Sequence, residues 1–107
     1  MRTNSGDFGL SQKTIASICQ IFSNYPAIQK AILYGSRAKG NYRHGSDIDL
    51  TLIGDLSHQD LNRIETQLDD LLLPYMIDLS LFKDIENSEL IDHVHRVGKT
   101  FYLLKHK

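Results

Sequence analysis

The stretch "LYGSRAKGNYRHGSDIDL", residues 33–50, joins two apolar segments through a loop rich in glycine and basic side chains. The segment before it, "IQKAILYG", is short, apolar and β-branched, and it stops at Gly35 as strands do. In the segment after it, "DIDLTLIG", Asp47 and Asp49 alternate with Ile48 and Leu50, which is the two-residue period of a strand. The stretch therefore predicts two strands joined by a loop, with carboxylates on one face of the second strand.

The loop itself has the composition of an anion site. Gly35 permits a tight turn or a close backbone approach, and Ser36 begins what reads as the first turn of a short helix, where free N–H groups favour phosphate oxygens. Ser36 can also add a hydroxyl. Four basic or histidine side chains can surround a polyphosphate there: Arg37, Lys39, Arg43 and His44. An ordinary strand-to-helix turn with solvated basic residues would have the same sequence, so the loop alone does not decide.

The rest of the chain predicts an alternation of helices and strands. Residues 1–9 have the composition of a frayed start, and Ser11 then caps a helix that reaches about Asn24. Ser57 caps a second helix to about Leu73, followed by a strand over residues 75–82. A last helix over residues 87–97 and a closing strand over 100–104 complete the order. We expect one α/β or α+β domain, residues 10–107, with a small mixed sheet flanked by helices.

A third carboxylate falls on the polar face of the strand over residues 75–82. Asp78 would meet Asp47 and Asp49 if the two strands are neighbours. Three carboxylates about 4 Å apart would repel by roughly 4 kcal/mol per pair at an effective dielectric near 20, and a divalent cation would turn that repulsion into coordination. Oxygen ligands alone suit Mg²⁺ or Mn²⁺ better than Zn²⁺. A phosphate loop beside such a site indicates phosphoryl or nucleotidyl transfer.

Charge and composition narrow the choice of function. The 107 residues carry 12 Lys and Arg against 13 Asp and Glu, for a net charge of −1, which argues against an extended nucleic-acid surface. The single Cys19 cannot form an internal disulfide and reads as core filler in the first helix. With no apolar run of membrane-spanning length and no secretory signal, we expect a cytoplasmic protein without membrane contact.

The motif Gly35, Ser36, ten residues, Asp47, Ile48, Asp49 resembles the signature of the polymerase-β-like nucleotidyltransferase superfamily. Within it, the short chain resembles a minimal nucleotidyltransferase, the antitoxin type encoded beside a HEPN-domain toxin. The resemblance implies AMPylation: NMP, most often AMP, moves from a Mg²⁺-bound NTP, here ATP, to a hydroxyl acceptor with release of pyrophosphate. In the antitoxin group the acceptor is a tyrosine of the toxin.

The resemblance also implies roles for seven residues. The catalytic and metal-binding set would be Asp47, Asp49 and Asp78, with Asp78 helping to deprotonate the acceptor. The nucleotide-binding set would be Gly35, Ser36, Arg37 and Lys39, the two cations neutralising the leaving pyrophosphate. Larger relatives carry further domains for their acceptor, so we expect another chain to complete the acceptor site here in a hetero-oligomer with the HEPN protein.

Several alternatives stay open at this stage. The chain could block a toxin by binding alone, or it could be the catalytic subunit of a two-chain transferase that acts on a small molecule or RNA. Tyr42 could stack on a base or be an ordinary exposed loop residue, and residues 43–45 could clamp phosphate or simply turn the chain. His93 and His95 stand two apart on a predicted helix, so they cannot chelate together, and we expect both to be surface residues.

Overall fold

Four strands form one mixed sheet in the order β3-β2-β1-β4. The computed structural model describes residues 8–105. The elements, in chain order, are α1 Gln12–Ser23, β1 Ile28–Tyr34, α2 Ser36–Lys39, β2 Ile48–Gly54, α3 His58–Asp69, β3 Ile77–Leu81, the 3₁₀ turn η1 Phe82–Asp84, α4 Ser88–Val97 and β4 Lys99–Leu103. This order confirms the predicted alternation and the predicted α/β class.

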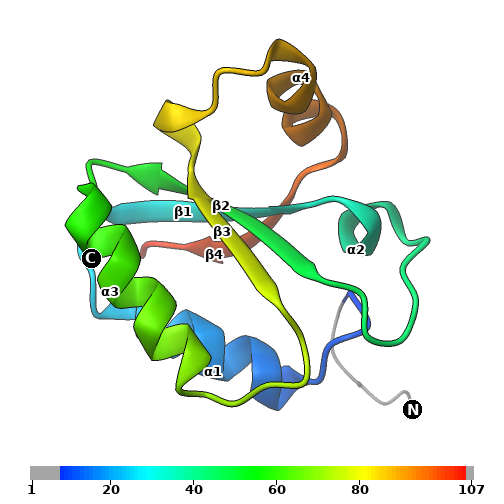
Figure 1. Ribbon diagram of the computed structural model, residues 1–107, viewed down its shortest axis with the longest axis horizontal. Coiled ribbons are helices and arrows are strands. Elements are labelled where there is room, and N and C mark those ends of the chain that lie inside the picture. Colours follow the sequence, from blue (N-terminus) through cyan, green and yellow to red (C-terminus); the bar gives the residue numbers. More distant parts are fainter. Residues whose placement is uncertain (1–7, 106–107) are drawn as a thin grey trace.

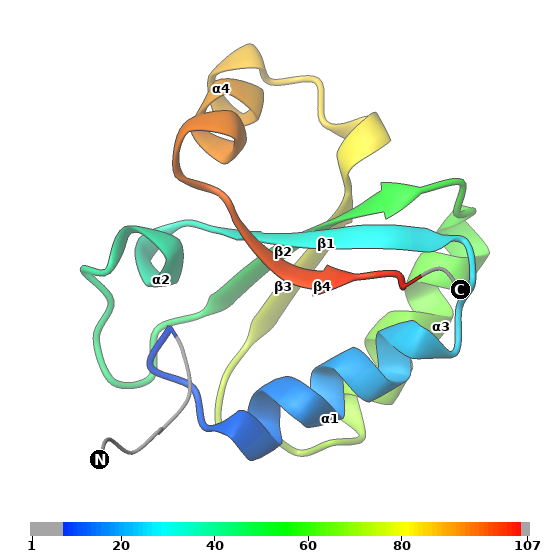
Figure 2. The same ribbon diagram turned by 180° about the vertical axis from the view of Figure 1, so that it is seen from behind.

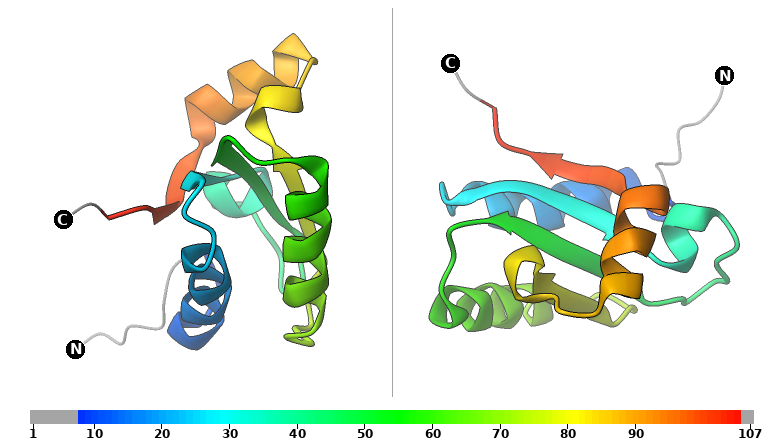
Figure 3. Two further views of the ribbon diagram at one scale, coloured as in Figure 1. Left: turned by 90° about the vertical axis from the view of Figure 1, so that its left-hand side faces the viewer. Right: turned by 90° about the horizontal axis from the view of Figure 1, so that it is seen from above.

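The helices cover the two faces of the sheet unequally. The helices α1 and α3 lie side by side under one face, and α4 lies over the other (Figure 1 and Figure 3). The strand β1 pairs antiparallel with β2 and with β4, which forms one edge of the sheet (Figure 2). The parallel pair β2 and β3 is connected through α3, because parallel neighbours need a crossover.

The hydrophobic core lies between the sheet and the pair α1 and α3. Ile18 and Phe22 of α1, Leu33 of β1, Leu50 of β2 and Ile64 of α3 are all fully buried there. Burying each such side chain stabilises the fold by about 1.5 to 3 kcal/mol. Since successive strand residues point to opposite faces, this core fixes which residues point toward α4.

Side-chain caps start the helices where the sequence predicts. The Ser11 hydroxyl accepts a hydrogen bond from the Thr14 N–H at 3.1 Å. Ser57 and Asp60 form a reciprocal capping box, with distances of 3.0 and 3.1 Å. The Asn87 side chain accepts from two N–H groups of the first turn of α4. These polar contacts satisfy backbone donors that the helix starts leave free.

Two predicted elements are shorter in the structure, and the closing strand predicted over residues 100–104 is β4, Lys99–Leu103. The helix predicted to reach Leu73 ends at Asp69, because Leu72 adopts a left-handed conformation with a φ of 54°. Pro74 restricts the residue before it to extended backbone, which also opposes a continued helix. The strand predicted over residues 75–82 spans only Ile77–Leu81, and Phe82 begins η1.

The start of the described chain is packed rather than loose. Phe8 lies within the predicted frayed start, yet its ring packs against Phe101 with centroids 6.2 Å apart. Residues 1–7, the rest of that predicted segment, lie outside the described residues. Over residues 8–105, no helix is both long and apolar enough to cross a membrane.

Candidate active site

A row of three side chains crosses the sheet on the face toward α4. In the strand register Asp49 of β2 is paired with Asp78 of β3 on one side and with Tyr34 of β1 on the other. Residues paired across neighbouring strands point to the same face, so the prediction that Asp78 lies beside Asp49 is confirmed. Asp47 precedes β2 and is exposed, as is Asp78, while Asp49 is half-buried.

The carboxylates influence each other electrostatically. Partial burial of Asp49 raises the pKa of its carboxyl above the usual value, and the charges of Asp78 and Asp47 raise it further. The three aspartates are therefore close enough to repel one another, and the ionised form of Asp49 destabilises the folded state.

The donor set fits an oxygen-seeking divalent cation. Within residues 8–105, no three His, Cys, Asp or Glu side chains are already arranged to hold a metal ion in this conformation. Asp47 and Asp78 are exposed, so packing against other residues does not fix their side chains. Carboxylate oxygens alone match Mg²⁺ or Mn²⁺.

Gly35 brings the two ends of the sequence motif into contact. Its φ of 77° and ψ of −157° define a conformation that only glycine adopts readily. A Cβ at this position would overlap with Oδ2 of Asp49. Ser36 follows at once as the first residue of α2 and is half-buried. The predicted phosphate loop therefore begins in contact with the carboxylate of Asp49.

Arg37 is buried inside the loop, with only 3% of its surface exposed. Its Nε and Nη2 both donate to the Ser46 carbonyl, at 3.1 and 2.9 Å, and its Nη1 donates to the Phe8 carbonyl at 2.7 Å. The guanidinium also lies over the rings of Tyr42 and Tyr75, 5.2 and 4.9 Å from their centroids. Arg37 thus ties the start of the loop to Ser46, the residue before Asp47, instead of presenting its charge to solvent.

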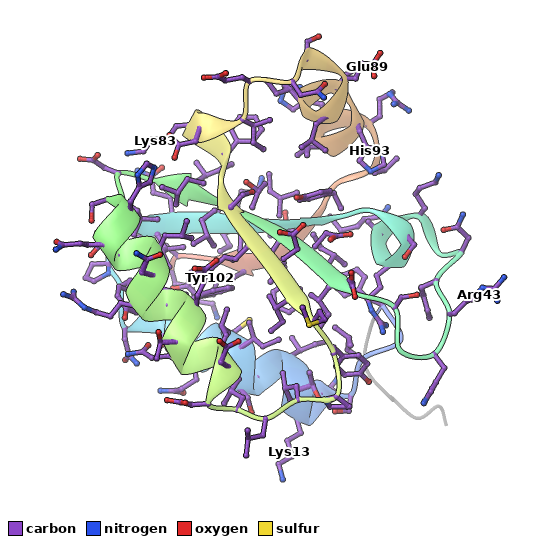
Figure 4. The ribbon with its side chains drawn as sticks, in the orientation of Figure 1. Lys13, Arg43, Lys83, Glu89, His93 and Tyr102 are labelled. Atoms are coloured by element: carbon purple, nitrogen blue, oxygen red, sulfur yellow. The ribbon has the colours of Figure 1, made fainter. Side chains whose placement is uncertain are left out.

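The other loop residues divide into exposed and internally bonded groups. Lys39 is exposed at the end of α2. The Arg43 N–H donates to the Ser46 hydroxyl at 2.7 Å, and the Ser46 N–H donates to the Arg43 carbonyl at 3.0 Å. This pair of bonds favours the turn interpretation of residues 43–45, and the Arg43 side chain points outward (Figure 4). Tyr42 is 36% exposed, with its ring against Arg37.

His93 was expected on the surface, and that prediction is wrong. It is half-buried, and its Nε2 accepts a hydrogen bond from the Gly35 N–H at 3.1 Å. The physical reason lies in helix geometry: His93 lies three residues after Leu90 and four before Val97, on the face of α4 that packs against the sheet. This spacing from two apolar residues was the feature of the sequence that could have predicted the burial of His93. His95 is exposed, as predicted.

A comparison with protein-family models identifies the family of the chain. The model described as "Polymerase beta, Nucleotidyltransferase" matches residues 16–107, which contain the loop, all three aspartates and every strand. The chain belongs to the polymerase-β nucleotidyltransferase family. This match confirms that the chain is a nucleotidyltransferase, as its resemblance through Gly35, Ser36, Asp47 and Asp49 implied. No curated protein matches the chain significantly.

Solved structures with the same fold include several toxin–antitoxin complexes. A chain of a toxin–antitoxin complex with AMP-PNP aligns with a TM-score of 0.66 at 22% identity, over 90% of this chain and 76% of the other. A chain from the complex of tri-AMPylated Shewanella oneidensis HEPN toxin with MNT antitoxin gives 0.64 at 21%, over 87% and 72%. An MntA-HepT complex gives 0.64 at 21%, over 88% and 74%. At these identities the likeness establishes the nucleotidyltransferase fold.

The candidate active site lies away from a large hollow on the surface. A hollow of about 730 Å³ lies at the opposite end of β1, where Pro26, Lys30 and Leu103 are among its lining residues. None of the predicted site residues lines it. The candidate active site is instead the open polar end of the sheet, where Asp47 and Asp78 meet solvent.

Proposed function

We propose that this nucleotidyltransferase moves AMP from ATP to a tyrosine hydroxyl of a HEPN-domain toxin and so acts as its antitoxin. The observation that carries the proposal is the register that sets Asp49 beside Asp78, with Gly35 against Asp49. Phosphate-binding backbone and metal-binding carboxylates then share one end of one sheet. This combination suits the transfer of a nucleotidyl group and no simple binding role requires it.

The choice of donor and partner is supported by the similar structures. One of them contains AMP-PNP, an analogue of ATP, and another contains an AMPylated HEPN toxin bound to an MNT antitoxin. Carried over to this chain, they favour ATP as the donor and a HEPN protein as the partner in a hetero-oligomer.

Asp47, Asp49 and Asp78 would hold Mg²⁺, or Mn²⁺ in its place. When bound, the ion would neutralise triphosphate charge and lower the pKa of an acceptor hydroxyl. Burial and the negative charges of Asp78 and Asp47 raise the pKa of Asp49. A cation shared by the three carboxylates would offset the repulsion among them, which fits this role.

The residues of the loop would bind and orient the triphosphate. Gly35 allows phosphate oxygens to approach the backbone, and the Ser36 hydroxyl can donate to one of them. Lys39, exposed at the end of α2, can neutralise charge that develops on the pyrophosphate. Arg37 was predicted to share that task, but its donors already bind two carbonyls, so we assign it to closing the loop.

The reaction needs an acceptor that reaches the outer strand of the sheet. The tyrosine oxygen would attack the α-phosphorus, the bond from that phosphorus to the bridging oxygen would break, and pyrophosphate would leave. Asp78 would accept the hydroxyl proton, as a general base within reach of the attacking oxygen. Asp78 is exposed on β3, an edge strand, so a side chain of another protein can approach it.

The test is transfer to the protein encoded next to this chain. The purified partner is incubated with this protein, Mg²⁺ and each NTP in turn, and its intact mass is measured. We expect the mass of one or more AMP groups to be added with ATP, on a tyrosine. Asp49→Asn should abolish the addition, while Asp55→Asn, which changes an exposed carboxylate outside the row, should leave it unchanged.

Two outcomes would contradict the proposal. Addition that survives in Asp49→Asn would place the chemistry elsewhere. An unmodified partner that is silenced equally well by wild type and by Asp49→Asn would favour an antitoxin that acts by binding alone. Transfer to a small molecule or RNA in place of the partner would favour the two-chain transferase.

A further inference from the structure

The helix α4 contacts the candidate site through the polar side chain of His93. Val94 is buried against the sheet, and His93, its neighbour, lies on the side of α4 that faces β1 and α2 (Figure 4). The ring of His93 meets the ring of Tyr34 edge-on, with centroids 6.1 Å apart and an interplanar angle of 83°. Tyr34 is paired with Asp49, so His93 lies at the β1 end of the row formed by Asp78, Asp49 and Tyr34.

The hydrogen bond to His93 acts on the most constrained residue of the loop. The Gly35 N–H donates to Nε2 of His93, so this nitrogen carries no proton, and a neutral ring holds its proton on Nδ1. A Cβ added to Gly35 would overlap with Oδ2 of Asp49. Gly35 therefore contacts both the imidazole of His93 and the carboxylate of Asp49.

The position of Gly35 determines the position of the loop that follows. The Gly35 carbonyl accepts the Lys39 N–H at 3.1 Å and thereby starts the turn of α2. A shift of Gly35 would move the Ser36 hydroxyl relative to Asp49. Small displacements of this kind matter, because misplacement of a catalytic group by about 1 Å can cost on the order of a hundredfold in rate.

We infer that His93 is a positioning residue of the nucleotidyltransferase site, which fixes Gly35 so that phosphate-binding loop and carboxylates keep their mutual geometry. The inference rests on the proposed function, since it assigns His93 to the triphosphate site. His93 touches neither the acceptor nor the metal in this role. It acts by accepting one backbone hydrogen bond.

Three variants separate this role from simple packing. His93→Phe keeps an aromatic ring beside Tyr34 but removes the acceptor. His93→Gln keeps an acceptor oxygen on a flexible side chain. His95→Phe makes the same ring substitution at an exposed position two residues away on the same helix and serves as the matched control.

The first measurement needs no nucleotide. Hydrogen exchange of the Gly35 amide is followed by NMR at a temperature well below the unfolding transition of every variant. We expect His93→Phe to speed this exchange at least tenfold, while His93→Gln and His95→Phe stay within about threefold of wild type. Unchanged exchange in His93→Phe would overturn the inference.

The second measurement is the affinity for ATP with Mg²⁺ by calorimetric titration. We expect His93→Phe to weaken it about tenfold and His93→Gln to restore most of the loss. Wild-type affinity in His93→Phe, or an equal loss in His93→Gln, would overturn the positioning role. Wild-type protein that binds no NTP overturns the proposed function instead, and the Gly35 exchange then still decides whether His93 fixes this backbone.

Discussion

Gly35→Ala should destabilise the protein more than the same change at any glycine in open space. At a φ of 77° and ψ of −157°, an alanine costs about 1 to 3 kcal/mol in backbone strain alone. The new Cβ would also overlap with Oδ2 of Asp49, and displacing that half-buried carboxylate adds at least about 1 kcal/mol. We therefore expect a total loss of about 3 kcal/mol.

Gly40→Ala is the matched control. Gly40 also has a positive φ, 91°, but a Cβ there meets nothing within 4 Å. Strain alone should cost about 1 kcal/mol. With roughly 4 °C of melting temperature per kcal/mol, Gly35→Ala should melt about 12 °C below wild type and Gly40→Ala about 4 °C below. Both are read from thermal unfolding followed by circular dichroism at neutral pH.

A double-mutant cycle isolates the contact between Gly35 and Asp49. In an Asp49→Ala background the carboxylate is gone, so Gly35→Ala should lose only its strain component, about 2 kcal/mol. Equal losses from Gly35→Ala and Gly40→Ala in the wild-type background would show that the Asp49 carboxylate does not restrict position 35. So would a Gly35→Ala penalty that is the same with and without the Asp49 carboxylate.

Three further predictions follow from the site and its supports. Because burial and the neighbouring carboxylates raise the folded-state pKa of Asp49 above its unfolded value, ionised Asp49 destabilises the metal-free fold, and Asp49→Asn should raise the melting temperature at pH 7. That gain should shrink as pH falls through the raised pKa into the ordinary carboxyl range, and a gain that grows on acidification would contradict it. Arg37→Met should cost about 3 kcal/mol in urea unfolding, because the Ser46 and Phe8 carbonyls lose their donors; a loss below about 1 kcal/mol would mean that the guanidinium does not close the loop. Ser57→Ala should cost about 1 kcal/mol by the same method through loss of the α3 cap, whereas an unchanged unfolding midpoint would show that the capping box contributes nothing.

Local signals were sufficient to predict most of the fold. Ser11, Ser57 and Asn87 mark helix starts through hydrogen bonds that span only a few residues, so the pattern is visible in the sequence. The alternation around Asp49 predicts the face on which its carboxylate lies. The sheet order depends on packing between distant segments, which no local pattern encodes.

The sequence predicted where the candidate site residues lie along the strands and the loop, and it predicted less well where their side chains point. Strand parity correctly set Asp78 beside Asp49, since one face of each strand had to enter the core. The sequence shows that Arg37 is positive but not that its guanidinium turns inward to Ser46. The spacing of His93 on its helix could have predicted its burial, but its hydrogen bond to the Gly35 backbone, 58 residues away in the chain, has no sequence signature.

A nucleotidyl transfer moves the α-phosphorus of ATP to the acceptor, whereas a phosphoryl transfer moves the γ-phosphorus, so labelled ATP distinguishes the two reactions. The protein, its HEPN partner and Mg²⁺ are incubated in parallel with ATP labelled on the α-phosphate and with ATP labelled on the γ-phosphate. We expect label on the partner from α-labelled ATP alone, with pyrophosphate released, and no label with Asp49→Asn. Label from the γ-phosphate, or equal α-labelling by the Asp49→Asn variant, would contradict nucleotidyl transfer at this site.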